Sequence, residues 1–121
     1  MTTADDVAAY LRGLKFHYVD EKELQEGIAL ALRKRGWPFD REVTLGRDAR
    51  IDLLMTKPWS VGIEVKIGGT SAAALGQMAK YASSDRVASL VLVTDRMQAG
   101  VQPESIHGKP IVVVNLLGGL R

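Results

Sequence analysis

Cysteine is absent from the 121 residues of this chain. Its absence excludes disulfide bonds, thiolate zinc sites and cysteine nucleophiles, and it is compatible with a cytoplasmic protein. The sequence also lacks any stretch close to the roughly 20 apolar residues of a membrane span, so we expect no membrane partner. The first ten residues, MTTADDVAAY, are acidic and polar, so we expect no signal peptide and a cytoplasmic location.

Charge of one sign is also scarce. The 16 Lys and Arg residues nearly balance the 14 Asp and Glu residues, and the resulting net charge of +2 does not by itself indicate nucleic acid. Hydrophobic residues make up 46% of the chain and charged residues 25%, which is the ordinary composition of a globular protein. The length suits one compact unit, so we expect a single domain over residues 1–121.

Hydrophobic spacing divides the chain into helices and strands. Apolar residues at helical spacing predict helices over residues 4–14, 20–35 and 70–83. Alternating or continuous apolar runs predict strands over residues 41–45, 50–55, 61–67, 88–94 and 111–116. This order predicts an α/β fold, a mixed central sheet flanked by helices. We expect the core to span about residues 20–116, and we expect residues 1–19 to form a helical N-terminal extension outside it.

Three charged residues stand out within these apolar strands. Glu64 and Lys66 are two residues apart on one predicted strand, so they project from the same face. Asp52 lies on the preceding strand, and a short turn at Pro58 makes the two strands neighbours. We therefore expect Asp52 and Glu64 to lie close together. A solvent-exposed cross-strand charge cluster is the alternative, although the apolar flanks IDLLM and GIEVKI favour burial and hence a need for partners or a metal.

Two carboxylates fixed on adjacent strands form a hard-oxygen site of the kind that Mg²⁺ prefers. The main-chain carbonyl of Val65 is a candidate third ligand beside Asp52 and Glu64. A metal bound there would polarise a phosphate oxygen and lower the pKa of a bound water. Lys66 would then hold or activate the attacking water, or stabilise the developing charge.

The segments Arg50-Ile-Asp52-Leu-Leu and Gly62-Ile-Glu64-Val-Lys66 resemble the PD-(D/E)XK nuclease superfamily. The proline of that motif is replaced here by Ile51. The resemblance implies a restriction-endonuclease-like core, α-β-β-β-α-β, to which this chain would add an N-terminal helix and a C-terminal strand. It also implies Mg²⁺-dependent hydrolysis of DNA phosphodiesters, with Mn²⁺ able to substitute. In that case Asp52 and Glu64 are metal ligands and Lys66 is the catalytic lysine.

The helix after the third strand contains Gln77-Met-Ala-Lys-Tyr81, which is similar to the Q-x-x-x-Y motif of RecB-like and phage-exonuclease-like branches. The spacing of four residues places Gln77 and Tyr81 on one helix face. From there they would reach DNA phosphates or orient the catalytic lysine. An ordinary amphipathic helix with a half-buried tyrosine is the alternative.

The first long helix offers three acids that could join the metal site. Glu21 lies on the same face as Leu24 of the apolar stripe, whereas Glu23 and Glu26 point away from it. The string Glu21-Lys-Glu-Leu24-Gln25 also resembles the start of virus-type replication–repair nucleases. We therefore expect Glu21 to be the third acid. The alternative is a first-turn acid that is favoured only by the helix dipole.

These features predict a Mg²⁺-dependent DNA endonuclease that recognises shape or ends, working in repair, recombination or phage DNA processing. The candidate DNA contacts are Arg47, Arg50, Lys80 and Tyr81. A non-catalytic DNA-binding or assembly module on the same fold, or an RNA-directed nuclease, is the alternative. A homodimer is also possible, in which the apolar last strand and the tail at residues 116–121 would supply the interface.

Overall fold

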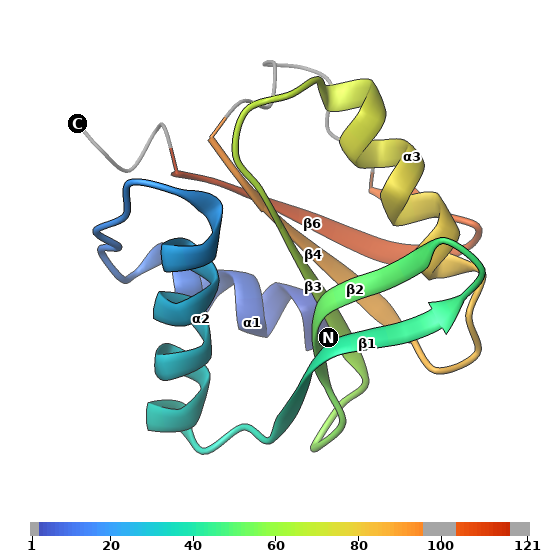
Figure 1. Ribbon diagram of the computed structural model, residues 1–121. Helices are drawn as coiled ribbons and strands as arrows, with labels where there is room; N and C mark the ends of the chain where they lie inside the picture. The colour runs from blue at the N-terminus through green and yellow to red at the C-terminus, as the bar shows by residue number, and fades with distance from the viewer. Residues whose placement is uncertain (1–2, 96–103, 117–121) are drawn as a thin grey trace.

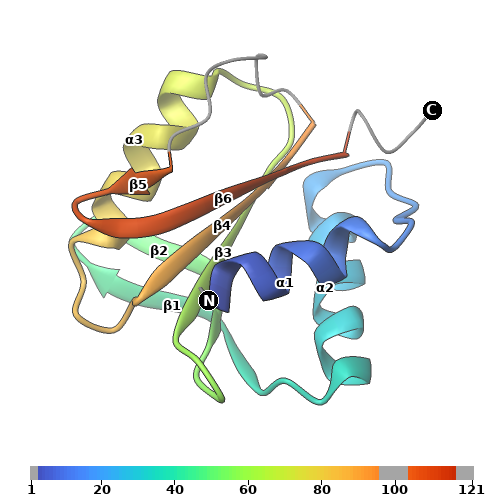
Figure 2. The same ribbon diagram turned by 180° about the vertical axis from the view of Figure 1, so that it is seen from behind.

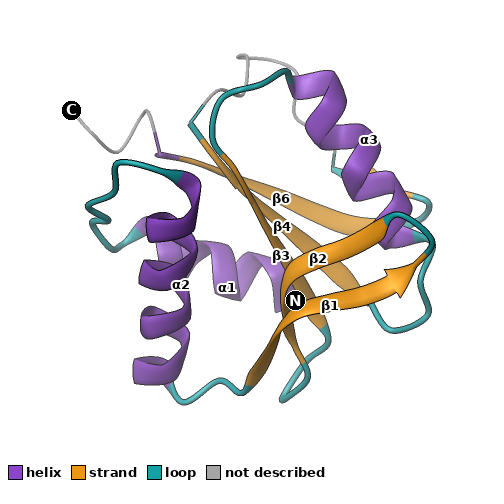
Figure 3. Cartoon of the chain, in the orientation of Figure 1, coloured by secondary structure: helices purple, strands orange, loops and turns teal. Residues whose placement is uncertain are grey.

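The computed structural model describes residues 3–95 and 104–116 (Figures 1 and 3). The described elements follow the predicted order with one short strand added. They are α1 (Thr3–Arg12), α2 (Glu21–Arg35), β1 (Phe39–Gly46), β2 (Ala49–Met55), β3 (Val61–Lys66), α3 (Ser71–Ala82), β4 (Ser89–Thr94), β5 (Ser105–Ile106) and β6 (Lys109–Asn115). In the described part of the chain the longest helix has 15 residues, and none has the length and apolarity needed to cross a bilayer.

The six strands form one mixed sheet in the order β1-β2-β3-β4-β6-β5. The pairs β1–β2 and β2–β3 are antiparallel, as their short connections require. The pairs β3–β4 and β4–β6 are parallel, and β5 is antiparallel to β6. The helix α3 makes the connection between the parallel strands β3 and β4. The predicted α/β fold with a mixed sheet is therefore confirmed.

Helices cover both faces of the sheet, and each face has its own hydrophobic core (Figures 1 and 2). On one face α1 and α2 pack over β3 and β4, where Ile63, Val65 and Val91 are fully buried. On the other face α3 packs over β2, β3 and β4. The strand β3 alternates as predicted, so its apolar residues face α1 and α2 while Gly62 contacts residues of the α3 core.

The expectation that the first helix lies outside the core is wrong. Ala4, Val7, Ala8 and Leu11 are all fully buried in the core beneath α1 and α2. They follow the i, i+3, i+4, i+7 spacing of a helical stripe, and their small alanines let α1 approach the sheet closely. The Tyr10 hydroxyl also donates a 2.8 Å hydrogen bond to a carbonyl of α2, so α1 is an integral layer of the domain.

The ends of the other helices follow their local sequence. The side chain of Asp20 accepts a 2.8 Å hydrogen bond from the amide of Glu23, which caps α2 as predicted. Gly36 ends that helix in the left-handed conformation, with φ of 80°. Before α3, Gly68 and Gly69 turn the chain with positive φ angles of 74° and 71°. The first turn fixes where α2 ends before β1, and the second fixes where α3 begins after β3.

The β1–β2 hairpin crosses from one face of the domain to the other, and the change occurs at Asp52. Ile51 belongs to the α3 core, whereas Leu53 belongs to the core beneath α1 and α2. Along β1, Glu42 adopts a left-handed conformation with φ of 52° between the ladder partners of Leu53 and Ile51. A non-glycine residue with this conformation is strained by roughly 1 kcal/mol. The strained residue therefore coincides with the twist that turns the hairpin.

Gly62 and Gly76 give a matched test of this packing. A Cβ on Gly62 would lie 2.6 Å from Ile51 Cδ1 and 3.0 Å from Leu90 Cδ2, and both neighbours are fully buried. A Cβ on Gly76, on the exposed side of α3, meets nothing within 4 Å. We predict that Gly62→Ala destabilises the protein by about 1–2 kcal/mol through overpacking. Gly76→Ala should stabilise it by about 1 kcal/mol through helix propensity.

Urea unfolding at one pH measures both variants against the wild type. Equal and small effects at the two positions would contradict the close packing of β3 against β2 and β4.

Candidate functional site

The candidate site lies where β2 and β3 separate. Their ladder pairs Met55 with Val61 and continues to Leu53 opposite Ile63, but no further pair follows. One step beyond, the same register places Asp52 opposite Glu64. The predicted proximity of these two carboxylates is therefore what the structure shows.

The two carboxylates replace the missing ladder hydrogen bonds in a reciprocal way. The amide of Asp52 donates to Glu64 Oε1 at 3.2 Å, and the amide of Val65 donates to Asp52 Oδ2 at 2.8 Å. Each strand thus supplies a backbone donor to the carboxylate of the other strand. This exchange satisfies the amides that the separating strands would otherwise leave unpaired and holds both carboxylates at fixed positions.

Burial and mutual repulsion raise the pKa of both carboxyl groups. Glu64 is only 7% exposed, and desolvation followed by the charge of Asp52 raises the pKa of Glu64 to about 8. Desolvation also raises the pKa of Asp52, and the charge of Glu21 adds to this effect. At neutral pH the pair therefore holds a proton unless a positive charge compensates it.

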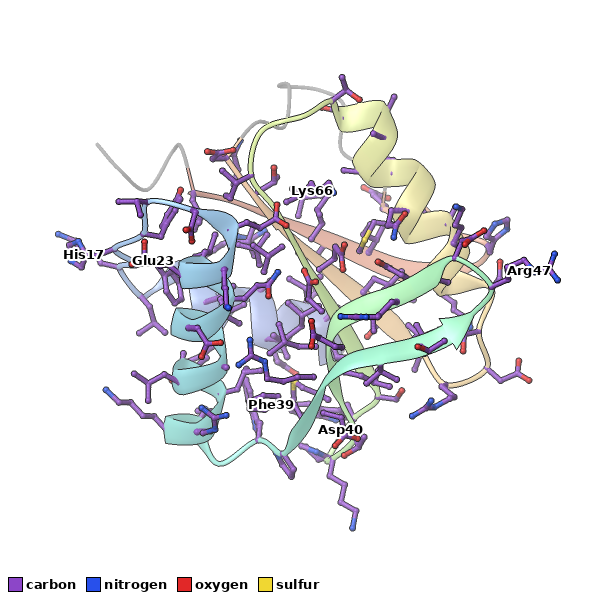
Figure 4. All side chains as sticks on the ribbon, in the orientation of Figure 1. His17, Glu23, Phe39, Asp40, Arg47 and Lys66 are labelled. Carbon is purple, nitrogen blue, oxygen red and sulfur yellow. The ribbon has the colours of Figure 1, made fainter. Side chains whose placement is uncertain are left out.

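Lys66 is the nearby cation, and its ammonium lowers the pKa of both carboxyl groups. It is half-buried at the last position of β3 and lies on the side of α3, far from Phe39 and Asp40 (Figure 4). Among the described residues, no carboxylate lies within ion-pair distance of Lys66. Its charge therefore acts on the pair through space and stays available to a further group.

Tyr81 connects α3 to this site. Its side chain is fully buried, and its hydroxyl donates a 2.8 Å hydrogen bond to the carbonyl of Arg50. Gln77 Nε2 donates to the same hydroxyl oxygen at 2.8 Å, as the spacing of four residues allows. Burial, followed by the charge of the nearby Glu64 carboxylate, raises the pKa of Tyr81. Tyr81 and Gln77 are thus held close to the carboxylate of Glu64.

The structure places Glu21 at the site and the other two acids of α2 elsewhere. Glu21 Oε1 accepts a 3.0 Å hydrogen bond from the amide of Ile67, just after β3. Glu23 instead accepts from the amide of Val19, and Glu26 forms a 2.7 Å ion pair with Arg41. The predicted inward direction of Glu21 agrees with this placement.

The oxygen atoms at the site are of the type that suits a hard cation. The amide of Val65 points toward Asp52, and in a strand the N–H and C=O of one residue point to the same side. The Val65 carbonyl therefore faces the gap that holds the carboxylates. In the described part of the chain, no three His, Cys, Asp or Glu side chains are grouped as a metal site. Two carboxylates and one carbonyl nevertheless suffice for Mg²⁺, which keeps waters and substrate phosphates as its other ligands.

The four candidate DNA contacts lie in different surroundings. Tyr81 is fully buried, so the direct DNA contact expected for it is corrected to an internal contact. Arg50 is exposed and forms a 2.7 Å ion pair with Glu42. Arg47 lies at the tip of the β1–β2 hairpin (Figure 4), and it lines one pocket together with Lys80. The homodimer prediction involves the tail, of which residues 117–121 lie outside the described residues.

Asp95 is a further acid near the site, beyond the residues predicted from the sequence. Its Oδ1 accepts a 3.2 Å hydrogen bond from the amide of Gly68, directly after β3. Burial and the nearby Asp95 carboxylate raise the pKa of the Tyr18 hydroxyl, which places Asp95 close to the loop before α2. An acid that directly follows the apolar run of β4 was the signal in the sequence.

The raised pKa of Glu64 predicts how stability changes with pH. The folded protein keeps the proton of Glu64 up to pH about 8, whereas an unfolded chain releases it near the ordinary pKa of 4.5. The folded state therefore holds more protons in this window, and its stability must fall as the pH rises through it. Without divalent cations, we predict that the free energy of unfolding drops by at least about 1 kcal/mol between pH 5.5 and 8.5.

Glu64→Gln should remove most of this pH dependence, whereas Glu104→Gln, at an exposed position, should leave it unchanged. Chemical denaturation at several pH values in EDTA provides the measurement. An unaltered slope in Glu64→Gln would show that another group controls it.

Comparisons with known proteins add a fold likeness. No protein-family model matches this chain, and no curated protein matches it. Among solved structures, a protein of unknown function from Silicibacter pomeroyi is similar, with a TM-score of 0.55 and 20% sequence identity. The alignment covers 76% of this chain and 62% of that protein, so this chain spans less than two thirds of the neighbour's length. At this identity the likeness concerns the fold alone.

Proposed function

We propose that this protein is a metal-dependent nuclease that hydrolyses phosphodiester bonds of DNA. The observation that carries the proposal is the reciprocal pair of carboxylates, the half-buried Asp52 and the buried Glu64, with Lys66 on the same strand as Glu64. Two mutually repelling carboxylates held at the opening between two strands are costly unless a cation joins them. A solvated surface charge cluster would not need to withdraw both groups from water within core strands.

The element order supports a restriction-endonuclease-like core. The series α2-β1-β2-β3-α3-β4 has the α-β-β-β-α-β order implied by the resemblance of the motif to PD-(D/E)XK nucleases. The acidic pair and the lysine lie on the second and third strands of this series, as that resemblance requires. We therefore include membership of that superfamily in the proposal.

Each residue of the site has a distinct role in this proposal. Asp52, Glu64 and the Val65 carbonyl would hold Mg²⁺ or Mn²⁺, and Glu21 would add a carboxylate from the start of α2. A cation held there would supply Lewis-acid chemistry, which polarises a phosphate and lowers the pKa of a water. Lys66 would hold the attacking water or stabilise charge that develops on the phosphate oxygens.

Tyr81 and Gln77 are positioning residues in this proposal, because their hydrogen bonds stay within the protein. A hydroxyl that is fixed on the Arg50 carbonyl, close to Glu64, limits the space in which the Glu64 carboxyl can rotate. A metal ligand that is already oriented loses little entropy when the cation binds.

The catalytic test is a nicking assay on supercoiled DNA with Mg²⁺ or Mn²⁺. We predict that Glu64→Gln and Lys66→Met each lower the cleavage rate by about 100-fold or more, because each removes a group that acts at the reacting phosphate. The matched controls Glu104→Gln and Lys57→Met alter the same residue types at exposed positions, and they should cut like the wild type.

Branched, linear and single-stranded DNA and an RNA of equal sequence complete the substrate panel. A wild type that cuts none of them would favour the alternative, a non-catalytic module on this fold. Preferential cleavage of the RNA would favour an RNA-directed nuclease.

Metal binding can be tested without any substrate. Since a ligand that binds only the folded state stabilises it, Mn²⁺ at about 100 times its dissociation constant should add about 2.7 kcal/mol to the wild type. We predict that this gain disappears in Asp52→Asn and shrinks in Glu21→Gln, but persists in Glu26→Gln, whose side chain pairs with Arg41. Thermal unfolding with and without Mn²⁺ measures the gain. Equal stabilisation of wild type and Asp52→Asn would place the cation elsewhere.

A further inference from the structure

An open pocket of about 280 Å³ lies between the tip of the β1–β2 hairpin and the C-terminal end of α3. The hairpin contributes Leu45, Gly46, Arg47 and Ala49, and the helix end contributes Lys80, Ser83 and Ser84. A water-sized group takes up about 30 Å³, so the pocket has room for a tetrahedral anion with its hydration. None of the metal-site carboxylates lines it.

The two cations of this pocket are unpaired among the described residues. Arg47 and Lys80 are both exposed, and no described carboxylate lies within ion-pair distance of either. In contrast, Arg41 and Arg50 each form a 2.7 Å ion pair. Arg47 projects from the hairpin tip (Figure 4), so its guanidinium can close over a bound group without breaking an existing contact.

The polar groups of the helix end also favour an anion. Ser84 Oγ accepts a 3.2 Å hydrogen bond from the amide of Arg86, which leaves the Ser84 hydroxyl hydrogen available to a ligand. The ammonium of Lys109 donates to the carbonyl of Ser84 and adds a positive charge beside that residue. This charge offsets the negative end of the α3 dipole.

Two acids follow these residues in sequence, Asp48 in the hairpin turn and Asp85 after the helix. Both are exposed and neither lines the pocket. The three cations Arg47, Lys80 and Lys109 therefore outnumber them, and the local charge remains positive.

The pocket is adjacent to the carboxylate pair along both elements that form it. Lys80 precedes Tyr81, and Ala49 precedes Arg50, whose carbonyl accepts the Tyr81 hydrogen bond. Asp52 lies three positions after Ala49 in the same strand, which corresponds to about 10 Å. Successive nucleotides of one strand are about 3.4 Å apart along the DNA axis. A DNA strand at the carboxylate pair would therefore pass the pocket within a few nucleotides.

We propose that this pocket binds a backbone phosphate of DNA and so sets the path of the strand across the site, a proposal that rests on the nuclease function above. Its described lining residues include no aromatic side chain that could stack on a base. Its donors are an arginine, a lysine and a hydroxyl, which suit a phosphate. Binding here is independent of base sequence.

The test compares two charge-matched double variants. Arg47→Gln with Lys80→Gln removes the pocket cations, and Arg33→Gln with Lys34→Gln removes one arginine and one lysine from exposed positions at the end of α2. Fluorescence anisotropy of a 20-base-pair duplex in EDTA measures affinity over a range of salt concentrations. For the pocket variant we expect the dissociation constant to rise about 10-fold and the slope of log K against log salt to fall by about 1, the contribution of one phosphate.

The α2 variant should change the slope by much less. An equal loss in both variants, or unaltered binding by the pocket variant, would overturn the proposal. Ser84→Ala keeps the charge, and it should weaken binding by about 2–3-fold through the loss of one hydrogen bond. This variant keeps the test decisive if the double variant fails to fold.

Cleavage of the same duplex, measured in parallel, separates this proposal from the nuclease function. The pocket variant should show a raised KM and a kcat within about 2-fold of the wild type, because the pocket contacts bind ground and transition states alike. A wild type that never cuts, together with the expected change in slope, would reject the nuclease and retain the phosphate pocket. Cleavage with an unchanged KM in the pocket variant would reject the pocket and retain the nuclease.

Discussion

The exchange of backbone amides between Asp52 and Glu64 is the interaction on which the rest of the structure depends. Where β2 leaves β3, each carboxylate accepts the main-chain hydrogen bond that the other strand can no longer make within the ladder. This exchange lets the hairpin turn away without leaving amides unpaired, and the turn brings Ile51 to the α3 core and Leu53 to the opposite core. A polar contact within apolar strands therefore holds β2 against β3 at the point where β2 passes from one core to the other. Removing either carboxylate leaves a backbone amide unpaired and destabilises this contact.

The same contact brings two negative charges close together, and their repulsion must be compensated. Two carboxylates share a largely water-excluded space, and burial raises the pKa of each. The charge of Lys66 lowers the pKa of both carboxyl groups. Among the described residues, however, its ammonium forms no ion pair with either carboxylate. A proton can satisfy the pair below pH about 8, and a divalent cation could satisfy it more fully because it neutralises both charges. The stability of the fold and the proposed chemistry therefore depend on the same charges.

The sequence predicted what periodicity controls, and it failed where packing decides. The two-residue spacing of Glu64 and Lys66 gave the shared face, and the turn at Pro58 gave the neighbouring strand with Asp52. The role of α1 was missed because its buried stripe contains the alanines Ala4 and Ala8, which a search for large apolar residues overlooks. The left-handed Glu42 and the carbonyl partner of Tyr81 depend on tertiary contacts, for which the sequence carries no local signal. The strand β5 has only two residues, too few for any periodic pattern.

The helix α3 relates the carboxylate pair to the phosphate pocket. Tyr81 and Lys80 are consecutive residues, yet one is buried against the carboxylate site and the other is exposed at the pocket. The hydroxyl of Tyr81 donates a hydrogen bond to the carbonyl of Arg50, so the helix and the hairpin are fixed to each other between the two sites. Such a link holds the distance from pocket to carboxylates nearly constant, which is what positioning a scissile phosphate requires. In the proposed nuclease, Lys80 binds the substrate and Tyr81 positions the Glu64 carboxylate. These two roles therefore belong to consecutive residues of one helix.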